Sequence, residues 1–351
     1  MILLVVGSIC SGMGTGMFAL RSILGEAFIN NHVSQAFHCE INKHAQRFHA
    51  DNWKGGGVLC EDVSHKAFRK APAVDLLTAG FPCQPFSLAG LGEGTADSQG
   101  RGTVIYNIIS YMRRTHPQTV VLENVEGLLT RHAQTCYQIL TLIRNIKTPS
   151  GNNFYNVQWE LLNTRIHGGL PQNRPRLYIV AHHQSNKRKF KMHWPKPIEM
   201  TKLKRVLDFK RGTLDDRLLL PNANAAKKKV QVVLEAMQEQ GIFATRVPVA
   251  IDCHSSKVHW CLGYTPCLTA ARGMQGGFWV TYRNHGLLSI GEMLRLQGFS
   301  PEEVIINNIA KTHMGKMLGN AFTQTVMERV LLPLLHSTGQ LRNVRLRDRW
   351  A

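Results

Sequence analysis

The chain has 351 residues, of which 44% are hydrophobic, which is enough for one large α/β domain and a smaller one. No stretch is long and apolar enough to span a membrane, and the apolar residues 1–7 lack the basic leader and cleavage site of a signal peptide. With 42 Lys and Arg against 23 Asp and Glu, the net charge of +19 favours nucleic acid as partner over a merely soluble basic protein.

The eight cysteines are scattered without paired spacing, which is typical of reduced thiols in a reducing compartment. Three of them lie near two histidines, a combination that can bind zinc. These five residues are Cys253, Cys261, Cys267, His254 and His259. Their spacing matches no C-x-x-C pattern, so we expect no metal site.

The chain opens as a strand, a glycine-rich turn and a helix. Residues 2–7 predict the strand, SICSGMGTG at residues 8–16 forms the turn, and residues 17–24 have helical character. Such glycines let a cofactor approach the backbone above a helix N-terminus, although a generic tight turn has the same pattern. Residues 33–39 predict a second strand that ends at Glu40, where a carboxylate can accept hydrogen bonds from ribose hydroxyls or remain a solvated surface group.

A further helix at residues 45–53 and a short strand at residues 58–63 precede an apolar strand at residues 74–77. That strand leads into FPCQP, where Pro82 and Pro85 break regular structure. Cys83 therefore lies on a stiff turn just beyond a strand's carboxyl end, where open α/β sheets bind ligands. It is a candidate nucleophile, and the alternative is an inert buried thiol.

A second reactive group is predicted beside the first. A Gly- and Ser-rich stretch at residues 88–102 leads to a helix at 104–113, and the strand at 119–122 then ends at Glu123. Because this strand lies beside the one that carries Cys83, the two strand ends predict a shared site. The alternative is that Glu123 caps the following helix.

Two arginines follow the next strand, at residues 155–163. Arg174 and Arg176 lie at alternate positions of LPQNRPR, before a strand at residues 177–181, so they point to one face of an extended segment. The alternative is a surface basic pair.

The doubly wound pattern fades from His182 to Val280. This segment has 17 Lys and Arg against 7 Asp and Glu, a net charge of +10, with dense runs at residues 187–191 and 227–229. Such runs usually mark solvated faces, but here they also fit phosphate contacts. Its glycine-rich end, at residues 265–280, could form a hairpin or a DNA-recognition loop.

The C-terminal part predicts an amphipathic helix at residues 287–299, then KMLGNA at 316–321, which starts a helix at 322–335. The tail carries several arginines that could contact phosphates or stay disordered. They are Arg342, Arg345, Arg347 and Arg349.

The motif FPCQPFS at residues 81–87 resembles the nucleophile motif of the DNA (cytosine-5) methyltransferases. The tripeptide ENV at 123–125, LRLQGF at 294–299 and KMLGNA follow in that family's order, over nearly the whole chain. The resemblance implies an α/β fold, with a doubly wound, mostly parallel sheet of the S-adenosylmethionine-dependent methyltransferase type and a smaller target-recognition domain. The implied boundaries are 1–181 for the catalytic and cofactor-binding domain, 182–282 for target recognition and 283–351 for a return segment.

The resemblance also implies methyl transfer from S-adenosyl-L-methionine to C5 of a flipped-out cytosine in double-stranded DNA. The implied catalytic residues are Cys83, which attacks C6, Glu123, which neutralises N3, Arg176, which stabilises O2, and Arg174, which holds the Glu123 carboxylate. The implied cofactor-binding residues are Cys10, Ser11, Gly12, Met13, Gly14, Glu40, Ile41, Asp62, Val63, Phe81, Asn320 and Ala321. The implied DNA-binding residues are Pro82, Gln84, Ser87, Arg101, Gln172, Thr269, Gly276 and Gly277.

Three other functions compete with this one. A related RNA-methylating branch acts on tRNA, but it usually has Pro in place of Phe81 and Thr in place of Ser87. A nicotinamide-dependent oxidoreductase would leave Cys83 and Glu123 unexplained, and a catalytically dead DNA-binding regulator would not retain both with Arg176. We expect a monomer on DNA, in the cytoplasm of a prokaryotic or virus-infected cell or in a eukaryotic nucleus.

Overall fold

The structure, a computed structural model, describes residues 1–53, 58–82, 101–184, 190–208, 221–244, 246–282, 286–337, 341 and 344–350. The chain divides into two compact units, each made of segments that are distant in sequence. Unit 1 comprises Met1–Leu162, Pro175–Lys196 and Val326–Ala351, and unit 2 comprises Asn163–Arg174 and Pro197–Thr325. No helix in the described ranges is long and apolar enough to cross a membrane.

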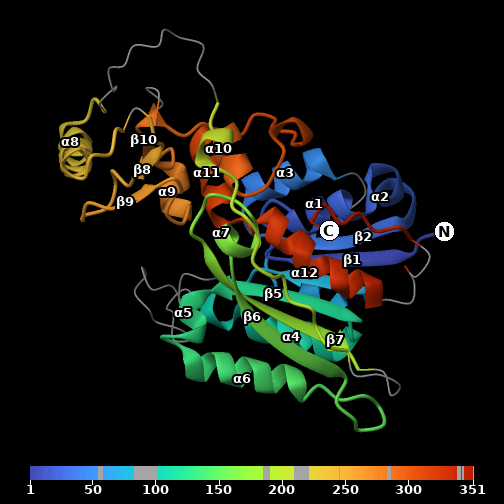
Figure 1. Ribbon diagram of the computed structural model, residues 1–351. Helices are drawn as coiled ribbons and strands as arrows, with labels where there is room; N and C mark the ends of the chain where they lie inside the picture. The colour runs from blue at the N-terminus through green and yellow to red at the C-terminus, as the bar shows by residue number, and fades with distance from the viewer. Residues whose placement is uncertain are drawn as a thin grey trace. The chain divides into compact units, whose positions relative to one another are not determined.

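A seven-stranded sheet in the order β3-β2-β1-β4-β5-β7-β6 forms the centre of unit 1 (Figure 1). Its strands are β1 (Leu4–Ile9), β2 (Val33–Cys39), β3 (Val58–Cys60), β4 (Leu76–Ala79), β5 (Thr119–Val125), β6 (Tyr155–Asn163) and β7 (Pro175–His183). Strands β1 to β5 pair in parallel, and β7 is antiparallel to β5. The strand order reverses between β1 and β4, which makes their carboxyl ends the expected ligand crevice.

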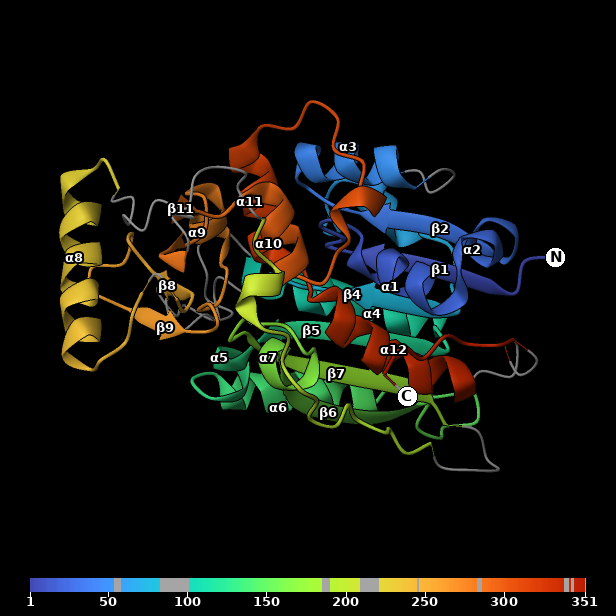
Figure 2. The same ribbon diagram turned by 45° about the horizontal axis from the view of Figure 1, so that its top comes forward.

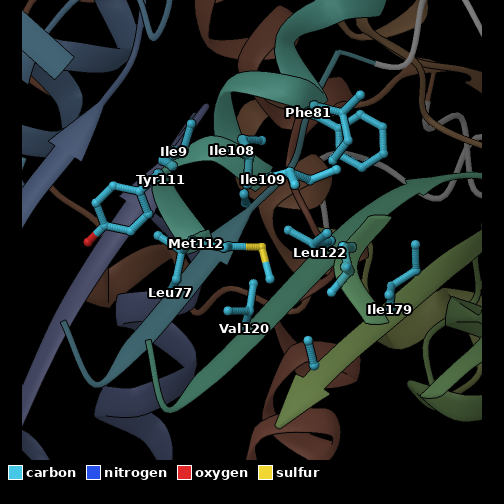
Figure 3. Packing of buried hydrophobic residues seen from close by; sticks show 14 of the residues in the cluster. Ile9, Leu77, Phe81, Ile108, Ile109, Tyr111, Met112, Val120, Leu122 and Ile179 are labelled. Atoms are coloured by element: carbon cyan, nitrogen blue, oxygen red, sulfur yellow. The ribbon is translucent and has the colours of Figure 1, made fainter. Parts of the chain in front are cut away.

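The core on one face of this sheet is built by strand alternation. Leu77, Val120, Leu122 and Ile179 point to the same face and are fully buried against helix α4 (Val104–Thr115) (Figure 3). Helix α6 (Ala133–Arg144) contributes to the same apolar cluster. Figures 1 and 2 show α1 (Thr15–Leu24) and α12 (Gln324–Ser337) over the opposite face. The remaining helices of unit 1 are α2 (Glu26–His32), α3 (Lys43–Asn52), α5 (Glu126–Leu129), η1 (Lys66–Lys70) and η4 (Arg101–Thr103).

Unit 2 contains a small antiparallel sheet in the order β11-β10-β8-β9. Its strands are β8 (Val249–Ile251), β9 (Trp260–Leu262), β10 (Trp279–Val280) and β11 (Gly286–Leu287). The helix α8 (Asn224–Glu239) lies along one side of this sheet (Figure 2), where Val230, Val233 and Met237 pack against Val249 and Ile251. The other helices are α7 (Thr164–His167), α9 (Ala270–Met274), α10 (Ile290–Leu296), α11 (Lys311–Asn320), η5 (Leu203–Arg205) and η7 (Pro301–Glu303).

The predicted fold class is confirmed, and the element bounds differ in informative places. KMLGNA does not start a helix, because Lys316 to Asn320 form the last half of α11 and Ala321 is already extended. The strand predicted at residues 58–63 ends at Cys60, and the helix predicted at residues 287–299 is confined to α10, whose start is fixed by a capping box between Ser289 and Glu292.

Candidate functional site

The two strand ends that predict the reaction site are neighbours in the sheet. In the register of β4 with β5, Ala79 pairs with Leu122, so Glu123 lies one residue beyond the pair. The Asn124 side-chain amide donates to the Phe81 carbonyl at 3.3 Å, which ties the FPC segment to the ENV tripeptide. Pro82 is half-buried. Cys83, Gln84 and Ser87 lie outside the described residues, as does the stretch from 88 to 100.

Glu123 is held by an ion pair from the neighbouring antiparallel strand. Arg176 opposes Val125 in the register of β5 with β7, so its side chain is diagonal to Glu123 on the same face. Arg176 Nε lies 3.1 Å from Glu123 Oε1, and both side chains are largely buried, at 12% and 8% exposure. Arg176 Nη1 also donates to the Pro175 carbonyl at 2.7 Å, which fixes the guanidinium plane.

Arg174 has a different environment from the one expected, which was contact with the Glu123 carboxylate. It is 1% exposed and donates to main-chain carbonyls of unit 2: Nη1 to Leu268 at 2.7 Å, and Nη2 to Gly319 at 3.2 Å and Ala321 at 2.7 Å. An arginine satisfies several carbonyls at once because its donors lie in a fixed planar fork. Glu123 forms an ion pair with Arg176, so Arg176 holds that carboxylate, and the expected contact of Arg174 with it stays a prediction.

Gln172 and Gln297 reinforce the same region of unit 2. Gln172 is fully buried, its amide donates to the Leu296 carbonyl at 2.9 Å, and its carbonyl accepts from Leu268 N at 2.8 Å. Gln297 donates to the Leu318 carbonyl at 2.7 Å. Gln172, expected to bind DNA, therefore supports the main chain next to Thr269 from inside the unit.

Glu40 organises the glycine-rich turn. Its Oε2 accepts from Gly12 N at 2.7 Å and its Oε1 from Asn42 N at 2.9 Å, just beyond the end of β2. Ser11 N donates to the Cys39 carbonyl at 3.2 Å and so joins the turn to the same strand end. Each carboxylate oxygen has two lone-pair sites, so each retains acceptor capacity after these bonds.

The glycines of this turn differ in what they require. Gly12 and Gly14 both have positive φ, at 52° and 71°, which favours glycine. A β-carbon on Gly14 would lie 2.7 Å from His49 Nδ1, whereas one on Gly12 would meet nothing within 4 Å. The His49 side chain therefore packs against the turn at Gly14, whereas the space beside Gly12 is open.

The remaining residues expected around the cofactor divide by exposure. Ile41 is 69% exposed and Asp62 is exposed, with Asp62 Oδ1 accepting from Ser64 N at 2.8 Å. Met13, Val63 and Phe81 are buried. Met13 and Phe81, at 0% and 2% exposure, can serve a ligand only through their main chain.

Cys10 follows β1 with a positive φ of 51°. Burial, and then the nearby Glu40 carboxylate, raise the pKa of its thiol well above the ordinary value, so the thiol is neutral. A neutral thiol packs as a small apolar group rather than as a nucleophile.

Thr269, Gly276, Gly277 and Asn320 all lie in unit 2. Thr269 caps α9 by accepting from Arg272 N at 3.3 Å and is exposed, as is Asn320 at the end of α11. Gly276 and Gly277 have φ of 84° and 75°, which favours glycine at both positions. Arg101 begins η4, and its side chain lies outside the described part.

Several residues that the sequence interpretation did not single out help to build the site. Asn124, Gln297 and His49 are buried polar groups whose importance comes from contacts with segments distant in sequence. Of these three residues, only Asn124 had a signal in the sequence, which is its position next to Glu123. In the described residues, no group of three or more His, Cys, Asp or Glu side chains is arranged to hold a metal ion.

The open sheet with its switch point at β1 and β4, and a carboxylate that braces a glycine-rich turn, define the class of Rossmann-like enzymes that bind a nucleoside cofactor. The chain belongs to the C-5 cytosine-specific DNA methylase family, whose model matches residues 5–335. It is a DNA (cytosine-5-)-methyltransferase, a class that depends on S-adenosylmethionine and acts on DNA.

Individual relatives agree with this assignment. The chain is 26% identical to the type II methyltransferase M.Bsp6I of Bacillus sp. (strain RFL6) over 295 residues, which covers 83% of this chain and 88% of that protein. It is 29% identical to M.HaeII of Haemophilus aegyptius over 309 residues, 86% of each. Among solved structures it resembles the Dnmt2 methyltransferase of S. pombe, with a TM-score of 0.61, 18% identity and coverage of 95% and 98%, a likeness of fold.

Proposed function

We propose that Cys83 attacks C6 of a cytosine flipped out of double-stranded DNA, and that Glu123 and Arg176 stabilise the ring during the reaction. The observation that carries this proposal is the buried Glu123–Arg176 pair, at the end of the strand next to the one that leads to Cys83. Because C6 is inaccessible in a stacked duplex, the base must leave the helix to reach such a site.

The chemistry requires an activated ring. The Cys83 thiolate forms a bond to C6, and the ring electrons move toward C5, while negative charge builds on N3 and O2. Glu123 shares or donates a proton at N3, and Arg176 donates hydrogen bonds at O2. After C5 has accepted the methyl group, the C5 proton is lost to a base or water, and the bond between sulfur and C6 breaks.

The residues of unit 1 fit the cofactor. S-adenosylmethionine supplies an electrophilic methyl group on a sulfonium. The remaining lone pairs of the Glu40 carboxylate can accept hydrogen bonds from ribose hydroxyls. The open space at Gly12 admits a ligand beside the turn, and the exposed Ile41 side chain can pack against a base. We assign Asp62 to the adenine amino group and, from the family resemblance of KMLGNA, Asn320 to cofactor binding.

We further propose that residues 1–181 and 283–351 carry out catalysis, while residues 182–282 recognise the target. The supporting feature is the net charge of +10 on residues 182–280. We also propose that the enzyme acts as a monomer on duplex DNA, in the bacterial cytoplasm. The bacterial sources of the type II relatives support the location.

The test uses purified protein with tritiated S-adenosylmethionine and either duplex DNA or tRNA. We expect label in DNA, and a duplex that carries 5-fluorocytosine to trap the wild type covalently, because its C5 substituent cannot leave as a proton. Cys83→Ser should bind DNA and cofactor within about tenfold of wild type, ~1.4 kcal/mol, yet form no adduct. Label in tRNA alone, or an adduct with the Ser variant, would contradict the proposal.

A further inference from the structure

The parallel strands of the large sheet begin at one edge, the amino edge, opposite the carboxyl edge at which Glu123 lies. Strands β4 and β5 begin there, and β7, which is antiparallel to β5, ends there, because Thr119 pairs with His182. The chain meets this edge in four described segments, at residues 69–75 before β4, 111–118 before β5, 144–155 before β6 and 182–184 after most of β7.

Hydrogen bonds join these four segments into one continuous surface of unit 1. Arg114 Nη2, at the end of α4, donates to the Ala71 carbonyl at 2.9 Å. His116 Nε2 lies 3.2 Å from the Lys147 carbonyl oxygen, to which it donates. The strand register of β5 with β7 adds the fourth segment. The amino edge is therefore a fixed surface rather than a set of independent loops.

The charge of the amino edge is strongly positive. The four segments contain six Lys and Arg against one acidic residue, whereas the whole chain has 42 against 23. The six are Arg69, Lys70, Arg113, Arg114, Arg144 and Lys147, of which all but the half-buried Arg144 are exposed. The acidic residue, Asp75, is half-buried, and its Oδ2 accepts from Val5 N at 2.8 Å. Among the residues that the structure describes, none of the six forms an ion pair.

Helix dipoles explain only part of this charge. Arg113, Arg114 and Arg144 lie in the last turns of α4 and α6, where a cation is favourable. Lys147 lies outside any helix, and its Nζ donates to Asn153 Oδ1 at 2.6 Å. Like charges that gather without carboxylates repel one another and destabilise the fold. A bound polyanion would remove that repulsion.

The uncharged side chains of the amino edge narrow the class of polyanion. None of the large hydrophobic side chains that are exposed in the described ranges lies in the four segments, so the edge has no apolar group to insert into a lipid surface. Tyr111 and Tyr155 are each 2% exposed, so their rings cannot stack on unpaired bases, as binding of a single strand requires. What remains is a surface suited to the phosphates of a duplex.

We infer that the amino edge is a second, sequence-independent binding surface for the phosphate backbone of duplex DNA, separate from the reaction site. Thr119 and Glu123 are four residues apart on β5, about 13 Å at ~3.3 Å per residue, and lie toward opposite edges of the sheet. A duplex that presents its cytosine to Glu123 would have to bend sharply around the sheet to reach the amino edge, and such bending is costly. The amino edge therefore takes another segment of DNA, which keeps the enzyme on DNA between encounters with its target.

The first test counts the duplexes bound per protein, by sedimentation velocity with an excess of a short fluorescent duplex at low salt. We expect two duplexes on wild type and one on the edge variant, which combines Arg113→Gln with Lys147→Gln. The control combines Arg47→Gln with Arg345→Gln, exposed residues of α3 and the C-terminal tail, and should keep two. One duplex on wild type, two on the edge variant, or one on the control would overturn the inference.

The second test identifies the polyanion by fluorescence anisotropy of the second binding event. Its log–log salt dependence should become shallower in the edge variant by about 0.9 for each lost phosphate contact. Unlabelled duplexes of target and unrelated sequence should displace the labelled duplex equally well, and better than tRNA or polyglutamate. An unchanged slope, a preference for the target sequence, or stronger displacement by tRNA or polyglutamate would each overturn the assignment to the duplex backbone.

The third test separates the amino edge from the reaction site. The edge variant should methylate a short target duplex at the wild-type single-turnover rate, because neither altered residue lies at the carboxyl edge. A lower rate would make these residues part of the reaction site and would overturn the inference. If wild type methylated no DNA, the proposed function would fail, while the number of bound duplexes would still decide the inference about the amino edge.

Discussion

Arg176 Nε lies 3.1 Å from Glu123 Oε1, across two antiparallel strands that are neighbours only in the folded sheet. The diagonal register puts both side chains on one face, at the end of β5 that lies beside the end of β4. An acid and a cation are thus fixed together near the segment that leads to Cys83. The pair gives the Glu123 carboxylate a defined orientation.

The first prediction concerns that pair. Glu123→Gln should lower kcat by about 10²-fold or more, because an amide cannot supply the proton at N3. Cofactor affinity should remain unchanged. Glu160→Gln, on the exposed part of β6 in the same sheet, is the control. Single-turnover methylation together with calorimetric cofactor binding checks both quantities, and wild-type turnover in Glu123→Gln would contradict the role.

The second prediction concerns the cofactor turn. Glu40→Gln should weaken S-adenosylmethionine binding by about 10- to 100-fold, because its carboxylate accepts hydrogen bonds from Gly12 N and Asn42 N and charge-assisted bonds are the stronger ones. An amide cannot accept at both positions. Glu26→Gln, whose side chain is 62% exposed, is the matched control. Isothermal titration calorimetry measures the affinity, and an unchanged Kd in Glu40→Gln would contradict the prediction.

The third prediction concerns Arg174. Arg174→Met removes the donor that the Leu268, Gly319 and Ala321 carbonyls share. Each carbonyl that stays unsatisfied should lower the free energy of unfolding by ~1–3 kcal/mol. We expect Tm to fall by about 5 °C or more. The control Arg165→Met removes a half-buried guanidinium that lies over the Tyr264 ring, and it should lower the free energy of unfolding by only ~1 kcal/mol.

Calorimetry and turnover of the Arg174 variant distinguish two roles. If Arg174→Met melted like wild type but lost all turnover, Arg174 would act directly in catalysis, as the sequence suggested. A fall in Tm that accompanies the loss of activity is the result expected from its buried contacts.

The fourth prediction uses two glycines. Gly273→Ala should destabilise unit 2 by several kcal/mol, because its β-carbon meets a backbone carbonyl that cannot move without shifting α11. Gly291→Ala in α10 should be neutral or stabilising by up to ~1 kcal/mol, since its nearest contact would be 3.7 Å away and alanine is the better helix former. Chemical denaturation measures both, and equal stabilities would argue against the α9–α11 contact.

The fifth prediction is a pH dependence of stability. Burial, followed by the charge of His38, lowers the pKa of His49 to about 3, and burial followed by His183 lowers that of His182 to about 4. Below pH 6.5 the unfolded chain therefore binds protons that the folded chain does not. The stabilising contribution is fully present above pH 6.5 and is lost as pH falls toward 3–4, at up to ~1.4 kcal/mol per pH unit for each histidine.

Thermal melts from pH 7 to pH 5 check this dependence. His49→Gln should show a smaller loss of Tm over that range than wild type, whatever its Tm at pH 7. His336→Gln, an exposed histidine at the end of α12, should keep the wild-type slope. A wild-type slope in His49→Gln would show that this histidine contributes nothing to the dependence.

The sequence by itself determined the fold class and the existence of two strands, β4 and β5, which are neighbours in the sheet and of which β5 carries Glu123. These features are local, because a few consecutive residues are enough to specify an apolar strand, a glycine turn or a proline break. For the same reason, the strands predicted at residues 33–39 and 155–163 have the same first and last residues as β2 and β6 in the structure. The sequence also established an excess of positive charge in residues 182–280.

The tertiary structure alone decided which charged groups are used and how. Arg174 and Arg176 are two residues apart and look equivalent in sequence, yet one binds carbonyls in unit 2 and the other pairs with Glu123 in unit 1. Lys229 belongs to a basic run that fitted phosphate contacts, yet Lys229 and Arg272 both hold the loop at residues 252–255, and a β-carbon on Gly273 would meet Gly315. Each of these contacts joins residues more than 19 positions apart. Periodicity and spacing describe one segment at a time, whereas a partner across space is fixed only when the chain packs.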